Sequence, residues 1–136
     1  MAFTYPHKVL FRHCDLAGIV FYPRYFEMMN DTVEEFFDTA LGAPFNAMHP
    51  ENGVPMAQIN VKFIKPSRHG ETIDLTIIGR RVGRSSFDAT IVASYGDETR
   101  FTAEVTMVYI NSEIRAVSWP AELRVGLLSH VEEASA

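Results

Sequence analysis

The fold of this chain is signalled by one stretch, Asp15-Leu16-Ala17-Gly18-Ile19-Val20-Phe21-Tyr22-Pro23-Arg24-Tyr25-Phe26. Its first half places a single carboxylate on a loop of small or apolar residues. Its second half opens a helix, because Pro23 suits the first helical position, where its missing N–H has no partner to lose. A helix start offers free backbone N–H groups and a positive potential. A carboxylate beside such a start, between apolar walls, has the parts to attack an electrophilic carbonyl or to activate water against it.

The hydrophobic pattern on either side of this stretch predicts the remaining elements. Apolar residues recur at steps of three and four over residues 23–41, which predicts one long helix that ends at Gly42 and Pro44. A connecting segment follows over residues 45–53. Alternating apolar residues predict a first strand over residues 5–13 and four later strands near residues 58–63, 73–77, 87–95 and 101–109. The tail over residues 120–131 is predicted to form a short helix.

One long apolar helix and five antiparallel strands predict an α+β fold in which the sheet wraps around a central helix. We expect residues 1–136 to form a single domain, because this length is sufficient for one sizeable core. A small curled sheet leaves edges and one face open. We therefore expect a homo-oligomer, a dimer at least.

Composition excludes several classes of function. The chain is 47% hydrophobic and 21% charged, as a globular protein is, and its net charge of −5 argues against a nucleic-acid partner. A single cysteine, Cys14, rules out an intrachain disulfide and suggests a reducing compartment. The first residues lack the apolar run of a signal peptide, and no segment approaches the roughly 18 apolar residues of a membrane span. We expect a cytoplasmic protein with no membrane partner.

The cysteine and the histidines offer weaker candidates for chemistry. His13 and Cys14 are neighbours on the predicted strand and would point to opposite faces, so a thiol–imidazole pair is disfavoured and Cys14 is expected to be buried. The five histidines show no ligand spacing, so no metal site is expected. His13 lies two residues before Asp15 and would tune or orient that carboxylate if the two share a face. A solvent-exposed role for His13 is the interpretation we prefer.

Two places compete for a functional role on residue types alone. Asp15 serves a turn or a catalytic site equally well, and Gly18 fits both, because glycine permits a positive φ or the close approach of a ligand. Arg84, Ser85 and Ser86 form a basic turn that is either a surface turn or a phosphate site. The carboxylates of the long helix are expected to lie on a solvated face: Asp31, Glu34, Glu35 and Asp38.

The run from Asp15 to Pro23 resembles the D-x-A-G-[IV]-V-[FWY]-Y-P signature of hot-dog-fold acyl-CoA thioesterases of the 4-hydroxybenzoyl-CoA thioesterase type. The likeness in layout extends over residues 5–111 and includes an R-x-S-F-like turn at residues 84–87. The resemblance implies a hot-dog fold and hydrolysis of an acyl-CoA thioester to a carboxylic acid and coenzyme A. It implies no cofactor, since coenzyme A is part of the substrate. It also implies sites built between subunits, commonly in tetramers made of dimers.

The same resemblance implies roles for individual residues. Asp15 would be the catalytic carboxylate, either as a nucleophile that forms a mixed anhydride or as a general base toward water. Tyr22 would polarise the thioester carbonyl through its backbone N–H. The phosphates of coenzyme A would be held by Arg84, Ser85 and Ser86. Gly18 is expected to line the substrate site because glycine permits the close approach of a ligand, not because of the resemblance.

Two departures from the family pattern concern the acyl pocket. Asn30 stands where the family carries Asp, and Val54 stands where it carries Thr, so the pocket they would line is less polar. The acyl group is therefore left open between 4-hydroxybenzoyl, another aromatic group and a short chain.

Two alternatives to a thioesterase also remain. A hot-dog hydratase or dehydratase would need a paired histidine and carboxylate, which no motif supplies, and a non-catalytic acyl-CoA-binding module would not need Asp15.

Overall fold

A computed structural model describes residues 1–132 of the chain. The N-terminal part contains β1 (Phe3–Lys8), the 3-10 turn η1 (Phe11–His13), α1 (Pro23–Glu35), the π-helical turn η2 (Phe36–Ala40) and α2 (Phe45–Met48). The strands that follow are β2 (Asn52–Gly53), β3 (Met56–Phe63), β4 (Thr72–Val82), β5 (Ser86–Tyr95), β6 (Glu98–Val108) and β7 (Ile110–Asn111). The last element is α3 (Ala121–Ser129).

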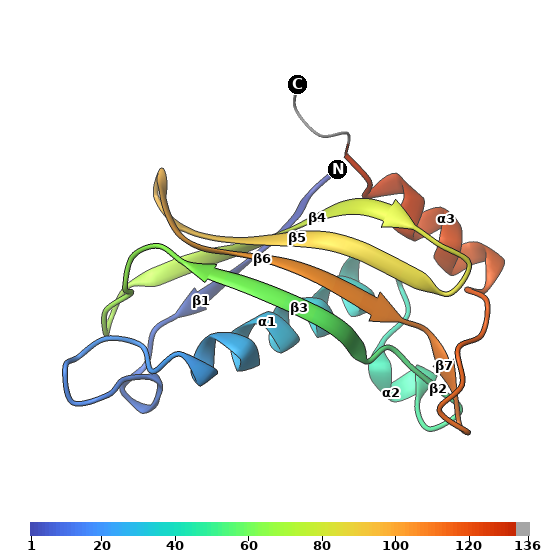
Figure 1. The fold of residues 1–136 in the computed structure, drawn as a ribbon, viewed down its shortest axis with the longest axis horizontal. Helices are drawn as coiled ribbons and strands as arrows, with labels where there is room; N and C mark the ends of the chain where they lie inside the picture. The colour runs from blue at the N-terminus through green and yellow to red at the C-terminus, as the bar shows by residue number, and fades with distance from the viewer. Residues whose placement is uncertain (133–136) are drawn as a thin grey trace.

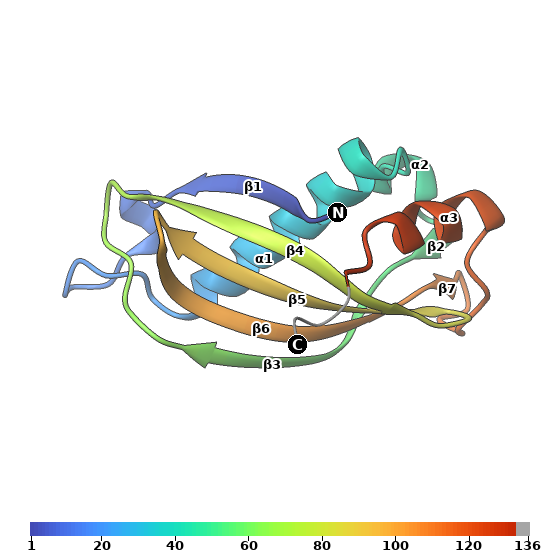
Figure 2. The ribbon, with the colours of Figure 1, turned by 90° about the horizontal axis from the view of Figure 1, so that it is seen from above.

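The main sheet has five antiparallel strands in the order β1-β4-β5-β6-β3, and β2 pairs with β7 in a separate ribbon. The sheet is curved, and α1 runs along one of its faces (Figures 1 and 2). The short helix α3 covers the end of β4 near the β4–β5 turn. This arrangement confirms the predicted α+β fold with one long helix against a five-stranded sheet. The predicted single domain of residues 1–136 reaches beyond the described residues at 133–136.

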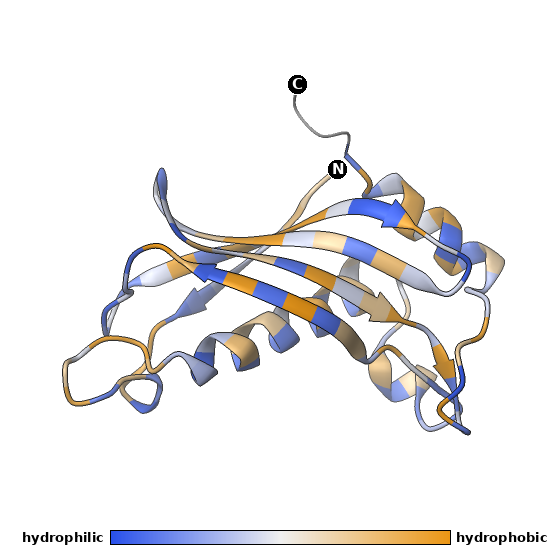
Figure 3. Cartoon of the chain, viewed as in Figure 1, coloured by the Kyte–Doolittle hydropathy of each residue, from blue (hydrophilic) through white to orange (hydrophobic). Residues whose placement is uncertain are grey.

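The core lies between α1 and the inward face of the sheet. Strands β4, β5 and β6 alternate buried and more exposed residues, as the period of a pleated strand requires, and Figure 3 shows these bands of hydropathy. The helix contributes one buried stripe that includes Met28, Met29 and Val33. Phe36 and Phe37 close this stripe and are both fully buried.

The long helix ends as the sequence predicts, but through an unpredicted π-helical turn. The Leu41 N–H donates to the Phe36 carbonyl at 3.1 Å, five residues back, which widens the last turn. Gly42 then adopts a φ of +64° and ends the helix. Phe36 and Phe37 lie in this wider turn, and both are buried in the core.

The predicted first strand over residues 5–13 is wrong at its end, because β1 stops at Lys8. Val9 leaves the sheet pairing and exchanges backbone hydrogen bonds with Gly70 and Glu71, at 2.9 and 2.7 Å. The chain then turns through η1, where the Leu10 N–H donates to the ring of His13 at 2.8 Å. An imidazole that accepts a nearby amide competes with strand pairing, which the alternation of apolar residues does not reveal.

Candidate active site

The loop between β1 and α1 is a tight hairpin. The Asp15 N–H donates to the Ile19 carbonyl and the Gly18 N–H donates to the Asp15 carbonyl, each at 3.0 Å. Gly18 has a φ of +77°, a conformation that costs other residues energy, and no atom lies within 4 Å of where its Cβ would be. The hairpin is docked on the segment before β4, because the Val20 N–H donates to the Ser67 carbonyl at 2.9 Å.

Asp15 lies at the tip of this hairpin with an exposed side chain. Its Oδ1 accepts the Ala17 N–H at 2.8 Å, so the carboxylate does stabilise the turn. A carboxylate has about four acceptor positions, however, and this bond occupies one. The turn-forming role and a chemical role for Asp15 are therefore compatible.

Asp15 lines a hollow of about 590 Å³ with mostly apolar walls. Gly18 and Phe21 contribute from the hairpin, and the remaining lining residues are Phe11, Arg12, Cys14, Leu16, Arg24 and His69. Sequence reasoning missed Phe11 and His69, whose rings lie 5.9 Å apart. No local pattern could have indicated His69, because it reaches the hollow only through the docking of the hairpin on the segment before β4.

Tyr22 sits at the start of α1, one residue before Pro23. In the described part of the chain its backbone N–H donates to no backbone acceptor, whereas the neighbouring Phe21 N–H is bound to the His13 carbonyl at 2.9 Å. Pro23 has no N–H, so the Tyr22 amide is available to an incoming oxygen at a helix start. The Tyr22 ring packs edge-on against Phe21 and Phe63 and does not line the hollow of Asp15.

Asn30 and Val54, the two residues expected to line the acyl pocket, lie around one hollow. This second hollow has a volume of about 450 Å³ and lies beside α2 and the β2–β7 ribbon. Asn30 also borders a shallow depression along α1 that contains Arg12 and Arg24, the two arginines of the Asp15 hollow. This depression therefore lies between the Asp15 hollow, with which it shares Arg12 and Arg24, and the second hollow, with which it shares Asn30.

The basic turn does not meet Asp15 within one chain. Arg84 and Ser85 lie in the β4–β5 turn and Ser86 begins β5, at the opposite end of the sheet from the hairpin (Figure 1). The Arg84 side chain is exposed and donates to the Ser118 hydroxyl at 3.1 Å, and the Trp119 N–H donates to the Arg84 carbonyl at 3.0 Å. The turn is therefore held by the segment before α3 and keeps its guanidinium at the surface.

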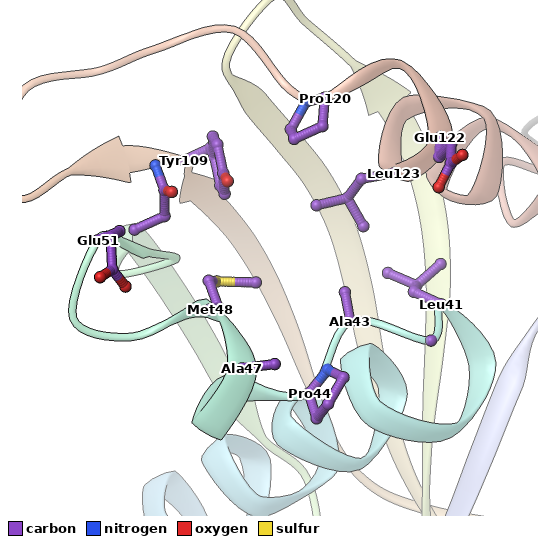
Figure 4. A pocket seen from close by; sticks show the side chains of 12 residues that line it. Leu41, Ala43, Pro44, Ala47, Met48, Glu51, Tyr109, Pro120, Glu122 and Leu123 are labelled. Atoms are coloured by element: carbon purple, nitrogen blue, oxygen red, sulfur yellow. The ribbon is translucent and has the colours of Figure 1, made fainter.

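A further hollow of about 440 Å³ lies at the same end of the molecule and contains none of the predicted site residues. Met48 and Leu123 extend into it from α2 and α3, and Tyr109 closes one side (Figure 4). Tyr109 is buried against Trp119, with ring centroids 5.1 Å apart, and burial raises the pKa of its hydroxyl. This hollow offers no activated nucleophile.

The structure corrects the predictions for His13 and Cys14. His13 is only 6% exposed, not a surface residue, and burial is the main cause that lowers its pKa. Cys14 is half-buried rather than fully buried, and its Sγ faces the Leu10 carbonyl at 3.6 Å. His13 is the last residue of the 3-10 turn η1 and Cys14 follows it, so the alternation of a strand does not apply to them.

The carboxylates of α1 lie at the surface, as predicted, with Glu35 half-buried. The structure nevertheless brings a histidine and a carboxylate together where no sequence motif does. His7 and His13 line a hollow of about 460 Å³ with Asp31 and its acidic neighbours on α1. Within residues 1–132, no group of three or more metal-ligating side chains is placed to hold a metal ion.

The chain is similar to known proteins over most of its length. Residues 9–127 match the sequence family described as the thioesterase-like superfamily. A 1,4-dihydroxy-2-naphthoyl-CoA hydrolase from Nostoc punctiforme is 22% identical over 117 residues, which cover 85% of this chain and 79% of the relative. None of the helices within residues 1–132 is long and apolar enough to cross a membrane.

Solved structures share the fold at low sequence identity. A gentisyl-coenzyme A thioesterase superimposes with a TM-score of 0.82 at 24% identity, over 89% of this chain and 98% of the other. A Staphylococcus aureus protein in complex with CoA superimposes with a TM-score of 0.89 at 14% identity, over 100% and 89% of the two chains. Together with the family match, these likenesses confirm the hot-dog fold predicted from the sequence.

Proposed function

Since this chain belongs to the thioesterase-like superfamily, we propose that it hydrolyses an aromatic acyl-CoA thioester, with Asp15 as the catalytic carboxylate. The observation that carries the proposal is that Asp15 lines one hollow with Phe21 and Arg24 at the start of α1, on a hairpin that leaves part of its carboxylate free. Family membership supports thioester hydrolysis as the reaction. The roles of individual residues rest on the geometry of this chain, and the acyl group rests on that geometry together with the names of two similar proteins.

In the proposed reaction, the thioester carbonyl binds near the Tyr22 amide at the start of α1. The N–H and the positive helix end stabilise the negative charge that develops on the carbonyl oxygen. Asp15 either attacks the carbonyl carbon or takes a proton from the water that attacks it. In both routes a C–O bond forms, the C–S bond breaks, and the coenzyme A sulfur leaves and receives a proton that comes from water. In the nucleophilic route a water molecule then hydrolyses the mixed anhydride, which releases the carboxylic acid and restores the Asp15 carboxylate. A preorganised donor of this kind is worth about 3–4 kcal/mol in the barrier.

We propose that Arg84, Ser85 and Ser86 act across a subunit boundary. The basic turn and Asp15 lie at opposite ends of one chain, so they serve one substrate only if a second copy brings its turn to this hairpin. Exposed apolar side chains around the hairpin and at, or just after, the end of the edge strand β3 support association. Leu16 and Phe11 are 108% and 80% exposed, and Phe63 and Ile64 are 48% and 46% exposed.

The aromatic acyl group is proposed from two observations. The hydrolase from Nostoc punctiforme and the gentisyl-coenzyme A thioesterase are both named for hydroxylated aromatic acyl groups. The hollow lined by Asn30 and Val54 has the volume of a small-ligand site, and Phe45 and His49 give it aromatic walls. Asn30 supplies an amide where a phenolic substrate would need a hydrogen-bond partner.

A thiol-release assay tests the proposal across 4-hydroxybenzoyl-CoA, benzoyl-CoA, 1,4-dihydroxy-2-naphthoyl-CoA, acetyl-CoA and palmitoyl-CoA. We expect the highest kcat/KM with an aromatic ester, because the hollow lined by Asn30 and Val54 has the volume for a ring and has aromatic walls. Tight binding without thiol release from any ester would instead identify a non-catalytic acyl-CoA-binding module.

One observation favours the hydratase alternative enough to justify a direct test. His7, His13 and Asp31 share a hollow, which supplies the histidine and carboxylate that such chemistry requires. Crotonyl-CoA distinguishes the two reactions, since a hydratase adds water across its double bond and leaves the thioester intact. We expect no hydrated thioester, and finding one without free thiol would replace the thioesterase proposal.

A further inference from the structure

We propose that His13 is a positioning residue for the catalytic hairpin, whose neutral imidazole holds the first turn of the loop and releases it on protonation. The expected effect of His13 on catalytic activity rests on the proposed function. The structural part of the inference concerns only the hydrogen bond from the Leu10 N–H to the His13 ring. The two parts are tested by separate measurements.

The backbone and side chain of His13 connect both ends of the hairpin. The Leu10 N–H donates to His13 Nδ1 at 2.8 Å, and the His13 N–H donates back to the Leu10 carbonyl at 3.0 Å. The His13 carbonyl accepts the Phe21 N–H at 2.9 Å, just before the start of α1. His13 therefore links the turn before Asp15 to the residue that precedes Tyr22.

The hydrogen bond from Leu10 fixes the protonation state of the ring. A backbone N–H can only donate, so His13 Nδ1 must carry its lone pair and the neutral ring must carry its proton on Nε2. Protonation would place an Nδ1–H against the Leu10 N–H, with two donors facing each other. The imidazolium is thus incompatible with the turn that the structure shows.

The surroundings of His13 also favour the neutral ring. Burial is the largest cause that lowers its pKa, and Arg12 and Arg24 add to it, whereas Glu27 and Asp31 oppose it. The hollow beside the ring also holds the charged or titratable groups His7, Lys8, Glu34 and Glu35. Since the folded pKa lies below the ordinary 6.5, the bonded turn is fully present above that pH and is lost as the pH falls through the folded pKa.

His7 provides the matched comparison in the same hollow. The Thr32 hydroxyl donates to the Met28 carbonyl at 2.8 Å, so its oxygen must accept from His7 Nε2–H at 2.7 Å. Protonation of His7 at Nδ1 does not oppose a backbone N–H, whereas protonation of His13 at Nδ1 opposes the Leu10 N–H. A loop transition caused by acid is therefore assigned to His13 and not to His7.

The structural part is tested by NMR on the full chain, following the Leu10 amide and the ring nitrogens of His13 from pH 8 to pH 5. We expect an Nε2–H tautomer at pH 8 and loss of Leu10 amide protection from exchange together with His13 protonation. An Nδ1–H tautomer at pH 8, or a Leu10 amide that stays protected when His13 is protonated, would overturn the inference. This result does not depend on any catalytic activity.

The kinetic part compares two substitutions of His13, by Asn and by Gln. Each side-chain amide places its oxygen, a hydrogen-bond acceptor, where a different nitrogen of the imidazole ring lies. Asn at position 13 puts its oxygen near Nδ1, and Gln puts it near Nε2. We expect His13→Asn to recover most of the activity and to move the acid limb of kcat to lower pH. We expect His13→Gln and His13→Ala to lose on the order of 10- to 100-fold in kcat, because the hairpin is misplaced.

A control at His7 separates this effect from general changes in the hollow. His7→Gln keeps a donor toward Thr32, and its acid limb should match the wild-type one. Equal losses in His13→Asn and His13→Ala, with thermal unfolding unchanged, would contradict the positioning role. If the wild-type protein releases no thiol from any ester, the proposed function fails while the NMR measurement still decides the structural part.

Discussion

The carboxylate of Asp15 accepts the Ala17 amide at 2.8 Å while its side chain remains exposed. Residue types alone left a turn and a catalytic role equally open for this position, and the geometry shows that one does not exclude the other. The hairpin fixes the direction of the carboxylate, and the hollow beside it supplies apolar walls and two arginines. The chemical role itself stays a prediction for experiment.

Gly18 gives a prediction that depends on its backbone alone. Its φ is +77° and there is open space where a Cβ would lie, so an added methyl group meets strain rather than a clash. We expect Gly18→Ala to lower the free energy of unfolding by about 1–2 kcal/mol, measured by urea denaturation. Gly18→Asn is the control, because asparagine tolerates this conformation better. Equal stability of the alanine and wild-type proteins would show that the hairpin relaxes freely.

At the scale of elements, the sequence predicts the helices and strands whose positions depend on the period of apolar residues and on prolines and glycines at helix ends. The long helix, the sheet strands and the C-terminal helix lie close to where alternation, Pro23 and Gly42 indicated. The end of β1 and the burial of His13 were missed, because both result from one side-chain hydrogen bond to the Leu10 amide. The docking of His69 beside the hairpin was missed because it depends on contacts between distant segments.

Arg100 on β6 anchors the segment on which the hairpin docks. It is 5% exposed and donates to Glu71, Glu98, the Pro66 carbonyl and the Ser67 hydroxyl. We expect Arg100→Leu to cost about 1–3 kcal/mol in the free energy of unfolding, because it leaves the half-buried Glu71 carboxylate with only the Arg68 N–H and removes the donor to the Pro66 carbonyl. Arg100→Lys, which keeps the charge but not the paired geometry, should lose less. Indistinguishable unfolding curves would contradict this anchoring role.

The same pair predicts how stability depends on pH. The hydrogen bond from Arg100 is the main cause that holds the pKa of Glu71 below its ordinary 4.5. Because the folded pKa is depressed, this stabilisation is complete above pH 4.5 and is lost as the pH falls through the folded pKa. Thermal unfolding from pH 7 to pH 3 should show a shallower acid loss in Arg100→Leu than in the wild type. Parallel curves would show that another group governs acid stability.

At the scale of the whole molecule, the account requires more than one copy of the chain. Asp15 and the basic turn lie at opposite ends of the sheet, and β3 is an edge strand whose residues are almost all exposed. An unpaired edge with exposed apolar side chains readily associates with another copy. Oligomerisation therefore stays a prediction with a direct consequence for activity.

A charge on the edge strand tests that prediction. We expect Ile59→Lys on β3 to shift the wild-type oligomer toward monomer in sedimentation velocity and to lower thiol release at least tenfold, because neighbouring lysines repel across a two-fold contact. Val125→Lys is the control, since Val125 is 68% exposed on α3, away from this edge. A wild-type protein that is monomeric at assay concentrations and fully active would contradict the shared site.

The most direct test of the central claim is the rate of thiol release by Asp15→Asn with the best aromatic acyl-CoA. Asparagine retains an oxygen for the Ala17 amide, so the hairpin stays formed while the nucleophile or base is removed. The account predicts a loss of kcat of about 10²–10⁴-fold with unchanged thermal stability. A variant that releases thiol at close to the wild-type rate would contradict the assignment of Asp15 as the catalytic carboxylate.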